Sequence, residues 1–126
     1  MADILIIDDE SMIRESLSNL FTREGYSVEV AVDGADGLKK FSENPARVVV
    51  TDIVMPEKEG IETITTMRKS NPNLKIIAMS GKGSGDFRLY LEMAGEFGAD
   101  VAIPKPFSRA QILGAVENLV GAASPH

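Results

Sequence analysis

The chain has 126 residues, 44% of them hydrophobic, which suits one domain with a core of its own. Its net charge is −6 and it has no dense lysine and arginine cluster, which argues against direct nucleic-acid binding. Cysteine is absent, so disulfides and thiol chemistry are excluded, and no apolar stretch approaches the roughly 20 residues that cross a bilayer. We therefore expect a cytoplasmic protein without membrane insertion.

Short apolar runs alternate along the chain with segments of helical periodicity. The predicted strands lie near residues 4–7, 28–32, 48–51, 76–79 and 101–103. Apolar residues recur every three or four positions in the predicted helices at 11–24, 35–43, 59–70, 86–97 and 107–120. Gly25 is placed to end the first helix in a left-handed conformation, and Ser108 can cap the last helix or the turn before it.

This alternation predicts an α/β fold, a doubly wound five-stranded parallel sheet with helices on both faces. Runs such as 4–7 and 48–50 are apolar at every position, as is usual for strands that are buried on both sides. Residues 1–122 are expected to form this single domain, and 123–126 a loose C-terminal tail.

Four of the predicted strands are followed by residues with charged or reactive side chains. Asp8 and Asp9 follow the first run, and Asp52 closes the third. Ser80 follows the fourth run, and Lys105 comes shortly after the fifth. Because the carboxyl ends of parallel strands share one edge, where α/β sheets bind ligands, these side chains are expected to meet there.

The residue types at this edge suit phosphoryl transfer. Clustered carboxylates repel one another, and a divalent cation between them removes this repulsion. Mg²⁺ binds a few carboxylates together with water and phosphate oxygens, so Asp8, Asp9 and Asp52 suit it. A carboxylate beside Mg²⁺ can also act as a nucleophile and form an aspartyl phosphate. Ser80 and Lys105 would then contact the oxygens of the phosphoryl group.

The motifs at the strand ends form a specific combination. They are Asp8-Asp9, Asp52-Ile53-Val54-Met55-Pro56 with Gly60, Ser80-Gly81, and Lys105-Pro106-Phe107. On these motifs the chain, over roughly residues 3–120, resembles the receiver domain of two-component response regulators, in particular its single-domain, CheY-like members. The resemblance implies a flavodoxin-like (βα)5 fold with strand order 2-1-3-4-5. It also implies a phosphorylation-operated signalling switch that is not an enzyme and has no attached output domain.

The resemblance further implies partners, a cofactor and residue roles. The phosphoryl donor would be a sensor histidine kinase or a histidine phosphotransfer protein, and the output a downstream protein target. Asp52 looks like the phospho-acceptor, Asp9 like a direct Mg²⁺ ligand, and Asp8 like an acid that assists partly through water. The backbone carbonyl of Val54 would complete the protein ligands.

Two further motifs concern the switch itself. Ser80 resembles the family's switch hydroxyl, and Lys105 the lysine that pairs with the phosphoryl group. An aromatic residue usually lies three positions before that lysine, whereas this chain has Ala102. Because a glycine-rich run at 81–85 follows Ser80, we expect activation to be expressed mainly through Ser80 and this run.

The residues disfavour three other functions. A Mg²⁺-dependent phosphohydrolase with an aspartyl-phosphate intermediate typically needs a second acid two residues after its nucleophile, where this chain has Val54. An interaction module that is never phosphorylated is disfavoured by the complete acceptor site. The glycine-rich run matches neither G-x-G-x-x-G nor G-x-x-x-x-G-K-[ST], which disfavours nucleotide binding.

Overall fold

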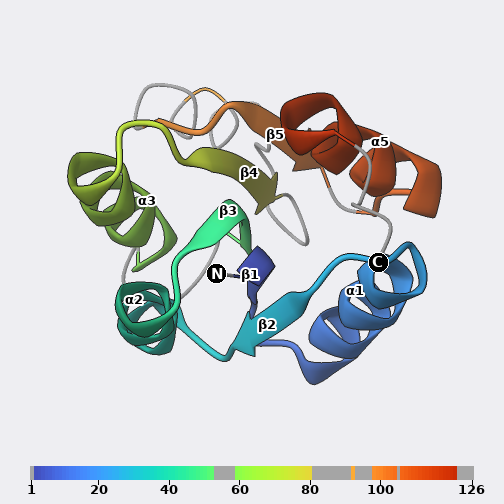
Figure 1. The fold of residues 1–126 in the computed structure, drawn as a ribbon, viewed down its shortest axis with the longest axis horizontal. Coiled ribbons are helices and arrows are strands. Elements are labelled where there is room, and N and C mark those ends of the chain that lie inside the picture. Colours follow the sequence, from blue (N-terminus) through green and yellow to red (C-terminus); the bar gives the residue numbers. More distant parts are fainter. Residues whose placement is uncertain (1, 53–58, 81–91, 93–97, 105, 122–126) are drawn as a thin grey trace.

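The computed structural model describes residues 2–52, 59–80, 92, 98–104 and 106–121. Figure 1 shows the arrangement of strands and helices in this part of the chain. In chain order the elements are β1 (Ala2–Ile7), α1 (Ser11–Arg23), β2 (Val28–Ala31), α2 (Gly34–Glu43), β3 (Ala46–Asp52), α3 (Glu59–Ser70), β4 (Lys75–Ser80), β5 (Val101–Pro104) and α5 (Arg109–Val120). None of the described helices is long and apolar enough to cross a membrane.

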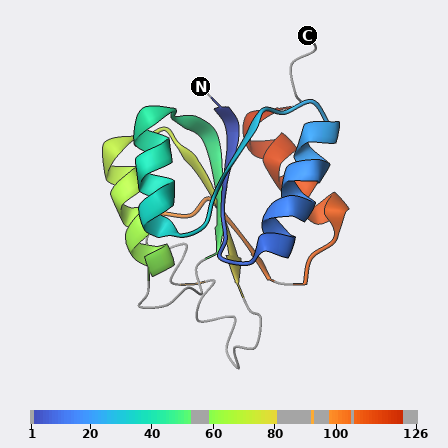
Figure 2. The same cartoon turned by 90° about the horizontal axis from the view of Figure 1, so that it is seen from below.

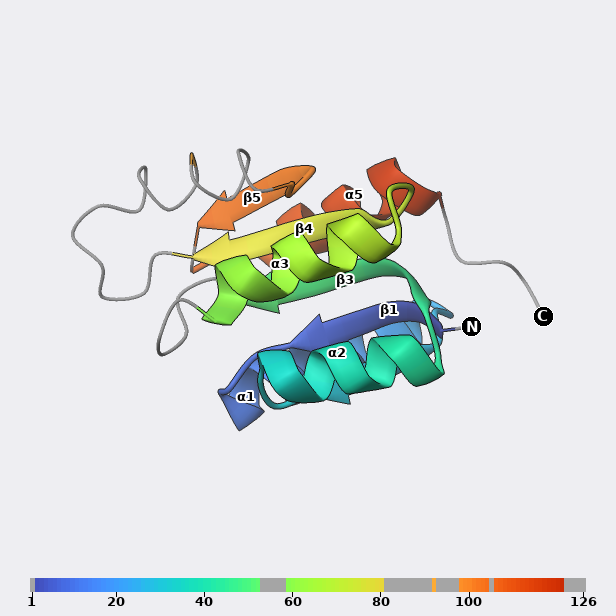
Figure 3. The same ribbon diagram turned by 90° about the vertical axis from the view of Figure 1, so that its left-hand side faces the viewer.

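The strands form one parallel sheet with the order β2-β1-β3-β4-β5. Viewed along the sheet in Figure 2, α1 and α5 cover one face, and α2 and α3 cover the other. Figure 3 shows α2 and α3 lying side by side along their face. These findings confirm the predicted fold class and the strand order that the resemblance implied.

The core is divided by the sheet into two clusters, because successive strand residues point to opposite faces. Leu5 and Ile7 of β1 belong to the cluster under α2 and α3. Ile4 and Ile6 belong to the cluster under α1 and α5, where they pack with Phe21. All of these side chains are at most 1% exposed, so the inner strand β1 is held from both sides and its carboxyl end has a fixed position.

Most element boundaries agree with the sequence within one or two residues, and the differences have local causes. Gly25 has a φ of 95° just after α1, which confirms the expected left-handed position. Ser108 is the N-cap of α5, where its hydroxyl accepts from the Gln111 N–H and the Gln111 side chain accepts from the Ser108 N–H. This capping box begins the helix at Arg109, two residues later than predicted. The predicted helix at 86–97 and the tail lie outside the described residues, apart from Glu92.

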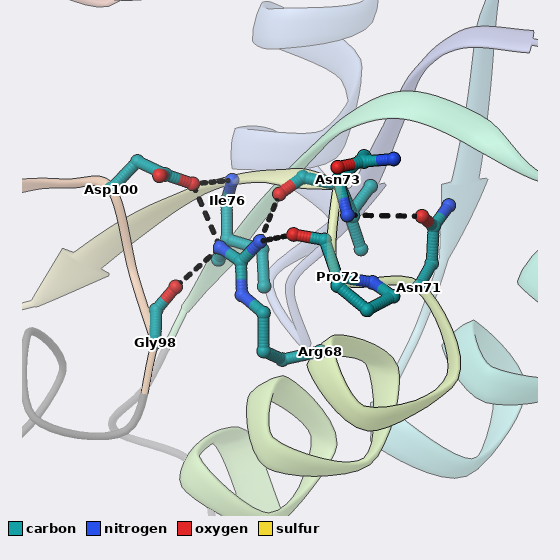
Figure 4. A network of polar contacts seen from close by, with 8 residues as sticks. Arg68, Asn71, Pro72, Asn73, Ile76, Gly98 and Asp100 are labelled. Atoms are coloured by element: carbon teal, nitrogen blue, oxygen red, sulfur yellow. Dashed lines mark hydrogen bonds and ion pairs between the residues drawn. The ribbon is translucent and has the colours of Figure 1, made fainter.

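At the amino ends of β4 and β5, Arg68 of α3 donates hydrogen bonds to backbone carbonyls that precede these two strands (Figure 4). Its Nη1 donates to the carbonyl of Leu74, which precedes β4. Its Nη2 donates to the carbonyl of Gly98 at 2.5 Å. A Cβ at Gly98 would lie 3.3 Å from the Arg68 Nε, and the φ of Gly98 is +118°. The arginine therefore packs closely against a backbone position that favours glycine.

The end of α5 is also fixed at the amino edge of the sheet. The Tyr26 hydroxyl donates to the carbonyl of Gly121 at 2.8 Å. Arg47, near the start of β3, donates to the carbonyl of Val120 at 2.9 Å. Carbonyls at a helix end carry partial negative charge and need donors, so these two side chains satisfy the last turn of α5.

Candidate functional site

The register of the two central strands brings two acidic residues together. Ile7 of β1 pairs with Thr51 of β3, so Asp8 and Asp52, each one residue further on, are neighbours at the carboxyl edge. Asp8 is 0% exposed and Asp52 is 4% exposed. Because a buried carboxylate is costly unless its charge is compensated, two of them side by side suit a site that receives positive charge.

The turn after β1 is fixed by hydrogen bonds around Asp8. Its N–H donates to the carbonyl of Ala31 at 3.2 Å, which continues the β1–β2 ladder. Its Oδ1 accepts from the Glu10 N–H at 2.9 Å, and its carbonyl accepts from the Arg14 Nη1 at 2.8 Å. Asp9, between these contacts, is exposed at the mouth of the site.

Three carboxylates gather at this turn. Asp8, Asp9 and Glu10 each offer an oxygen, and these oxygens lie within 4.8 Å of one another. An all-oxygen donor set of this kind suits a hard cation such as Mg²⁺, and the exposure of Asp9 leaves room for the waters that this ion retains. The residues present therefore fit the predicted metal.

Glu10 was not among the predicted ligands, although it directly follows the acidic pair in the sequence. It was missed because it stands at the expected start of a helix, where an acidic residue has an ordinary structural explanation.

The other predicted site residues are only partly described. The backbone of Ser80 ends β4, and Ser80 pairs with Pro104 of β5. Since Asp52 pairs with Met79, the residue before Ser80, these strand ends lie at the same edge as the acidic residues. Val54, Lys105 and the glycine-rich run at 81–85 lie outside the described residues, so their predicted roles stay predictions.

Ala102 occupies the position where the family usually has an aromatic residue. It is a half-buried residue of β5 and pairs with Ala78 of β4. With Gly114 and Asn118 it lines a shallow groove between β5 and α5. The small side chain thus leaves open surface on this side of β5.

Comparison with known families identifies the class of protein. A family model described as "Response regulator receiver domain" matches residues 4–117. The chain therefore belongs to the response regulator receiver domain family, whose members work as phosphorylation switches in two-component signalling.

Curated relatives agree with this assignment. Response regulator MprA of Mycobacterium sp. (strain KMS) is 35% identical over 123 residues, which are 97% of this chain and 52% of that protein. The "Transcriptional regulatory protein CpxR homolog" of Haemophilus influenzae is 32% identical over 126 residues, which are 99% of this chain and 53% of that protein. The chain thus spans about half the length of the curated relatives that it matches.

Solved structures show the same fold. The crystal structure of a response regulator receiver domain protein from Clostridium thermocellum is 31% identical, with a TM-score of 0.85 over 95% of this chain and 94% of that one. A CheY-like receiver domain protein from Methanospirillum hungatei JF-1 is 31% identical, with a TM-score of 0.82 over 94% of both chains. The fold is that of CheY-like receiver domains.

Proposed function

We propose that the chain is a signalling switch in which Asp52 accepts a phosphoryl group in a Mg²⁺-dependent reaction. The observation that carries this proposal is the position of Asp52, buried at the carboxyl end of β3 and next in register to Asp8. Asp8 in turn belongs to the group of carboxylates at the turn after β1. The receiver domain would comprise residues 1–122.

The metal would be held by the side chains of Asp8, Asp9 and Asp52 and by the backbone carbonyl of Val54. When bound, Mg²⁺ supplies positive charge that offsets the carboxylates and the oxygens of an incoming phosphoryl group. Glu10 is close enough to share this task through a water molecule, because its carboxylate belongs to the same group.

The transfer step uses the carboxylate of Asp52 as the nucleophile. One of its oxygens forms a bond to the phosphorus of a donor phosphohistidine while the phosphorus–nitrogen bond breaks. The electron pair of the broken bond stays on the imidazole nitrogen, which takes up a proton. The Ser80 hydroxyl and the Lys105 ammonium would bind the oxygens of the transferred group and report its presence.

The donor would be a cytoplasmic sensor histidine kinase domain or a histidine phosphotransfer protein, and the phosphorylated chain would act on a downstream protein target. Phosphoryl transfer between two proteins needs Asp52 at an accessible edge. The exposed Asp9 and the half-buried Glu10 beside it support a site that another protein can reach.

The proposal is tested with acetyl phosphate and Mg²⁺, followed by intact-protein mass spectrometry. The wild-type chain should gain one phosphoryl group that hydroxylamine removes, and Asp52→Asn should gain none. Asp3→Asn, at the opposite end of the sheet, is the matched control and should be labelled normally. Undiminished labelling of Asp52→Asn, or full labelling in the presence of EDTA, would contradict the proposal.

A further inference from the structure

Helix α1 begins without the usual side-chain cap. Its N-cap is Glu10, whose backbone is extended (φ −89°, ψ 118°) and whose side chain makes no capping hydrogen bond. The first turn of the helix also has no acidic residue. Serine, threonine, asparagine or aspartate at the N-cap normally fixes the direction in which a chain enters a helix, and contacts made by neighbouring residues can take over this role.

Arg14 performs this task from inside the helix. Its side chain turns back across six residues, and its Nη1 donates to the carbonyl of Asp8 at 2.8 Å. Its backbone N–H donates to the carbonyl of Glu10 at 3.1 Å. The second bond is the ordinary first hydrogen bond of an α-helix. The contact particular to Arg14 is therefore the one to Asp8, in the short segment 8–10 that carries all three carboxylates of the group.

The hydrogen bond to the Asp8 carbonyl can orient this whole segment. It belongs to the peptide that joins Asp8 to Asp9, so its orientation sets the directions in which both side chains leave the backbone. The Asp8 side chain is held in addition by the Glu10 N–H at 2.9 Å. With its peptide and one carboxylate oxygen both fixed, the second carboxylate oxygen of Asp8 has little freedom before any ion arrives.

Arg14 is also suited to this role by its charge and position. The side chain is half buried, and it lines a groove on α1 together with Ser11, Glu15 and Val30 of β2. A guanidinium has five N–H donors in a planar arrangement, so it can hold a carbonyl and face solvent at the same time.

We infer that Arg14 is a positioning residue of the magnesium site. It orients Asp8 and Asp9 through the Asp8 peptide and does not itself touch the metal or the phosphoryl group. This inference rests on the proposed function for the identity of the metal, but the ordering of residues 8–10 is a property of the metal-free protein. The two can therefore be tested separately.

The decisive comparison uses Arg14→Lys and Arg14→Gln. Lysine keeps the charge and loses the planar set of donors, whereas glutamine loses the charge and keeps a shorter N–H donor. NMR titration with MgCl₂ should show about tenfold weaker binding for both variants, the size of loss typical when a partner of a metal ligand is removed. Amide exchange of residues 8–10 should be faster in both metal-free variants than in the wild type.

Arg23→Gln is the matched control, since Arg23 is an exposed arginine in the last turn of the same helix. It should bind Mg²⁺ like the wild type and leave the exchange of residues 8–10 unchanged. Thermal unfolding of each variant, followed by circular dichroism, shows that the variants are folded at the titration temperature.

Four results would overturn the inference. If Arg14 acted only through its charge, Arg14→Gln would bind Mg²⁺ more tightly than the wild type and Arg14→Lys would bind equally well. If its role were only to stabilise α1, both variants would unfold at lower temperature with unchanged Mg²⁺ affinity. A wild-type protein that bound no Mg²⁺ would remove the proposed metal and this inference together, whereas normal binding by both variants would overturn the inference alone.

Discussion

Arg68 in α3 and Asp100 just before β5 form an ion pair, with 2.8 Å between Nη2 and Oδ2, although 32 residues separate them in the sequence. The same Oδ2 of Asp100 accepts from the Ile76 N–H of β4 at 2.8 Å. Arg68 also donates to the carbonyls before β4 and at Gly98, so this pair joins a helix, a strand and the entrance to the next strand. The amino ends of β4 and β5 are thereby held in register opposite the acidic site.

We predict that Arg68→Met destabilises the domain by about 2 kcal/mol, because several carbonyls and the Asp100 carboxylate lose a charged donor. The free energy of unfolding in urea measures the effect. Lys69→Met, at the next and exposed position of α3, is the control and should change it by less than about 0.5 kcal/mol. Equal stability of the two variants would contradict a structural role for the Arg68 contacts.

Removing one acid from the site should change the Mg²⁺ affinity and the thermal stability in opposite directions. Asp9→Asn is expected to weaken Mg²⁺ binding more than about tenfold, while the metal-free variant unfolds at a higher temperature because one repelling charge is gone. Thermal unfolding at low ionic strength, with and without MgCl₂, measures both effects. Glu15→Gln changes an exposed acid in α1 and controls for net charge. Wild-type Mg²⁺ affinity in Asp9→Asn would remove Asp9 from the ligands.

The close approach of α2 to β1 gives a third prediction. A Cβ on Gly37 would clash with the Cδ1 of Ile7 and lie 2.9 Å from its Cγ1, and Ile7 is fully buried. Gly37→Ala should therefore destabilise the domain by about 1–2 kcal/mol, because overpacking outweighs the better helix propensity of alanine.

Gly114 in α5 supplies the opposite case, since a Cβ there would meet nothing within 4 Å. Gly114→Ala should stabilise the domain by up to about 1 kcal/mol through helix propensity alone. Urea unfolding measures both effects. A stabilised Gly37→Ala would contradict the close packing at Gly37, and a destabilised Gly114→Ala would contradict the open space at Gly114.

A fourth prediction concerns alkaline pH. Burial, and next the negative charge of Glu117, raise the pKa of Tyr26 above its usual value. The stability that this hydroxyl contributes is therefore present below about pH 10, the pKa in the unfolded chain, and is lost as pH rises through the higher pKa of the folded chain. Tyr26→Phe should be about 1 kcal/mol less stable at neutral pH, since the bond to the Gly121 carbonyl is lost.

The sequence has two tyrosines, so Tyr90→Phe isolates the absorbance change of Tyr26. Titration of that variant followed in the ultraviolet should show Tyr26 ionising above about pH 10. Ionisation at or below that pH would refute the predicted shift.

The fold could be predicted because its signals are local and repeated. Apolar runs identified the described strands, and the rule that parallel strands share a carboxyl edge was enough to bring Asp8 and Asp52 together. Glu10 and Arg14 could not be found in this way, because their roles depend on how one turn is closed and not on any periodic pattern. The Arg68 contacts were missed for the same reason, since an arginine near a helix end has an ordinary explanation as a solvated charge near the helix dipole.

Strand β3 carries Arg47 near its start and Asp52 at its end, five residues apart, which in an extended strand is about 16 Å. Arg47 holds the last turn of α5. Asp52 is 4% exposed and the strand between the two residues is largely buried, so salt in the solvent would screen the charge of a phosphoryl group on Asp52 much less than it screens charges at the surface. Any effect of a phosphoryl group on Asp52 at the last turn of α5 should therefore depend little on salt concentration.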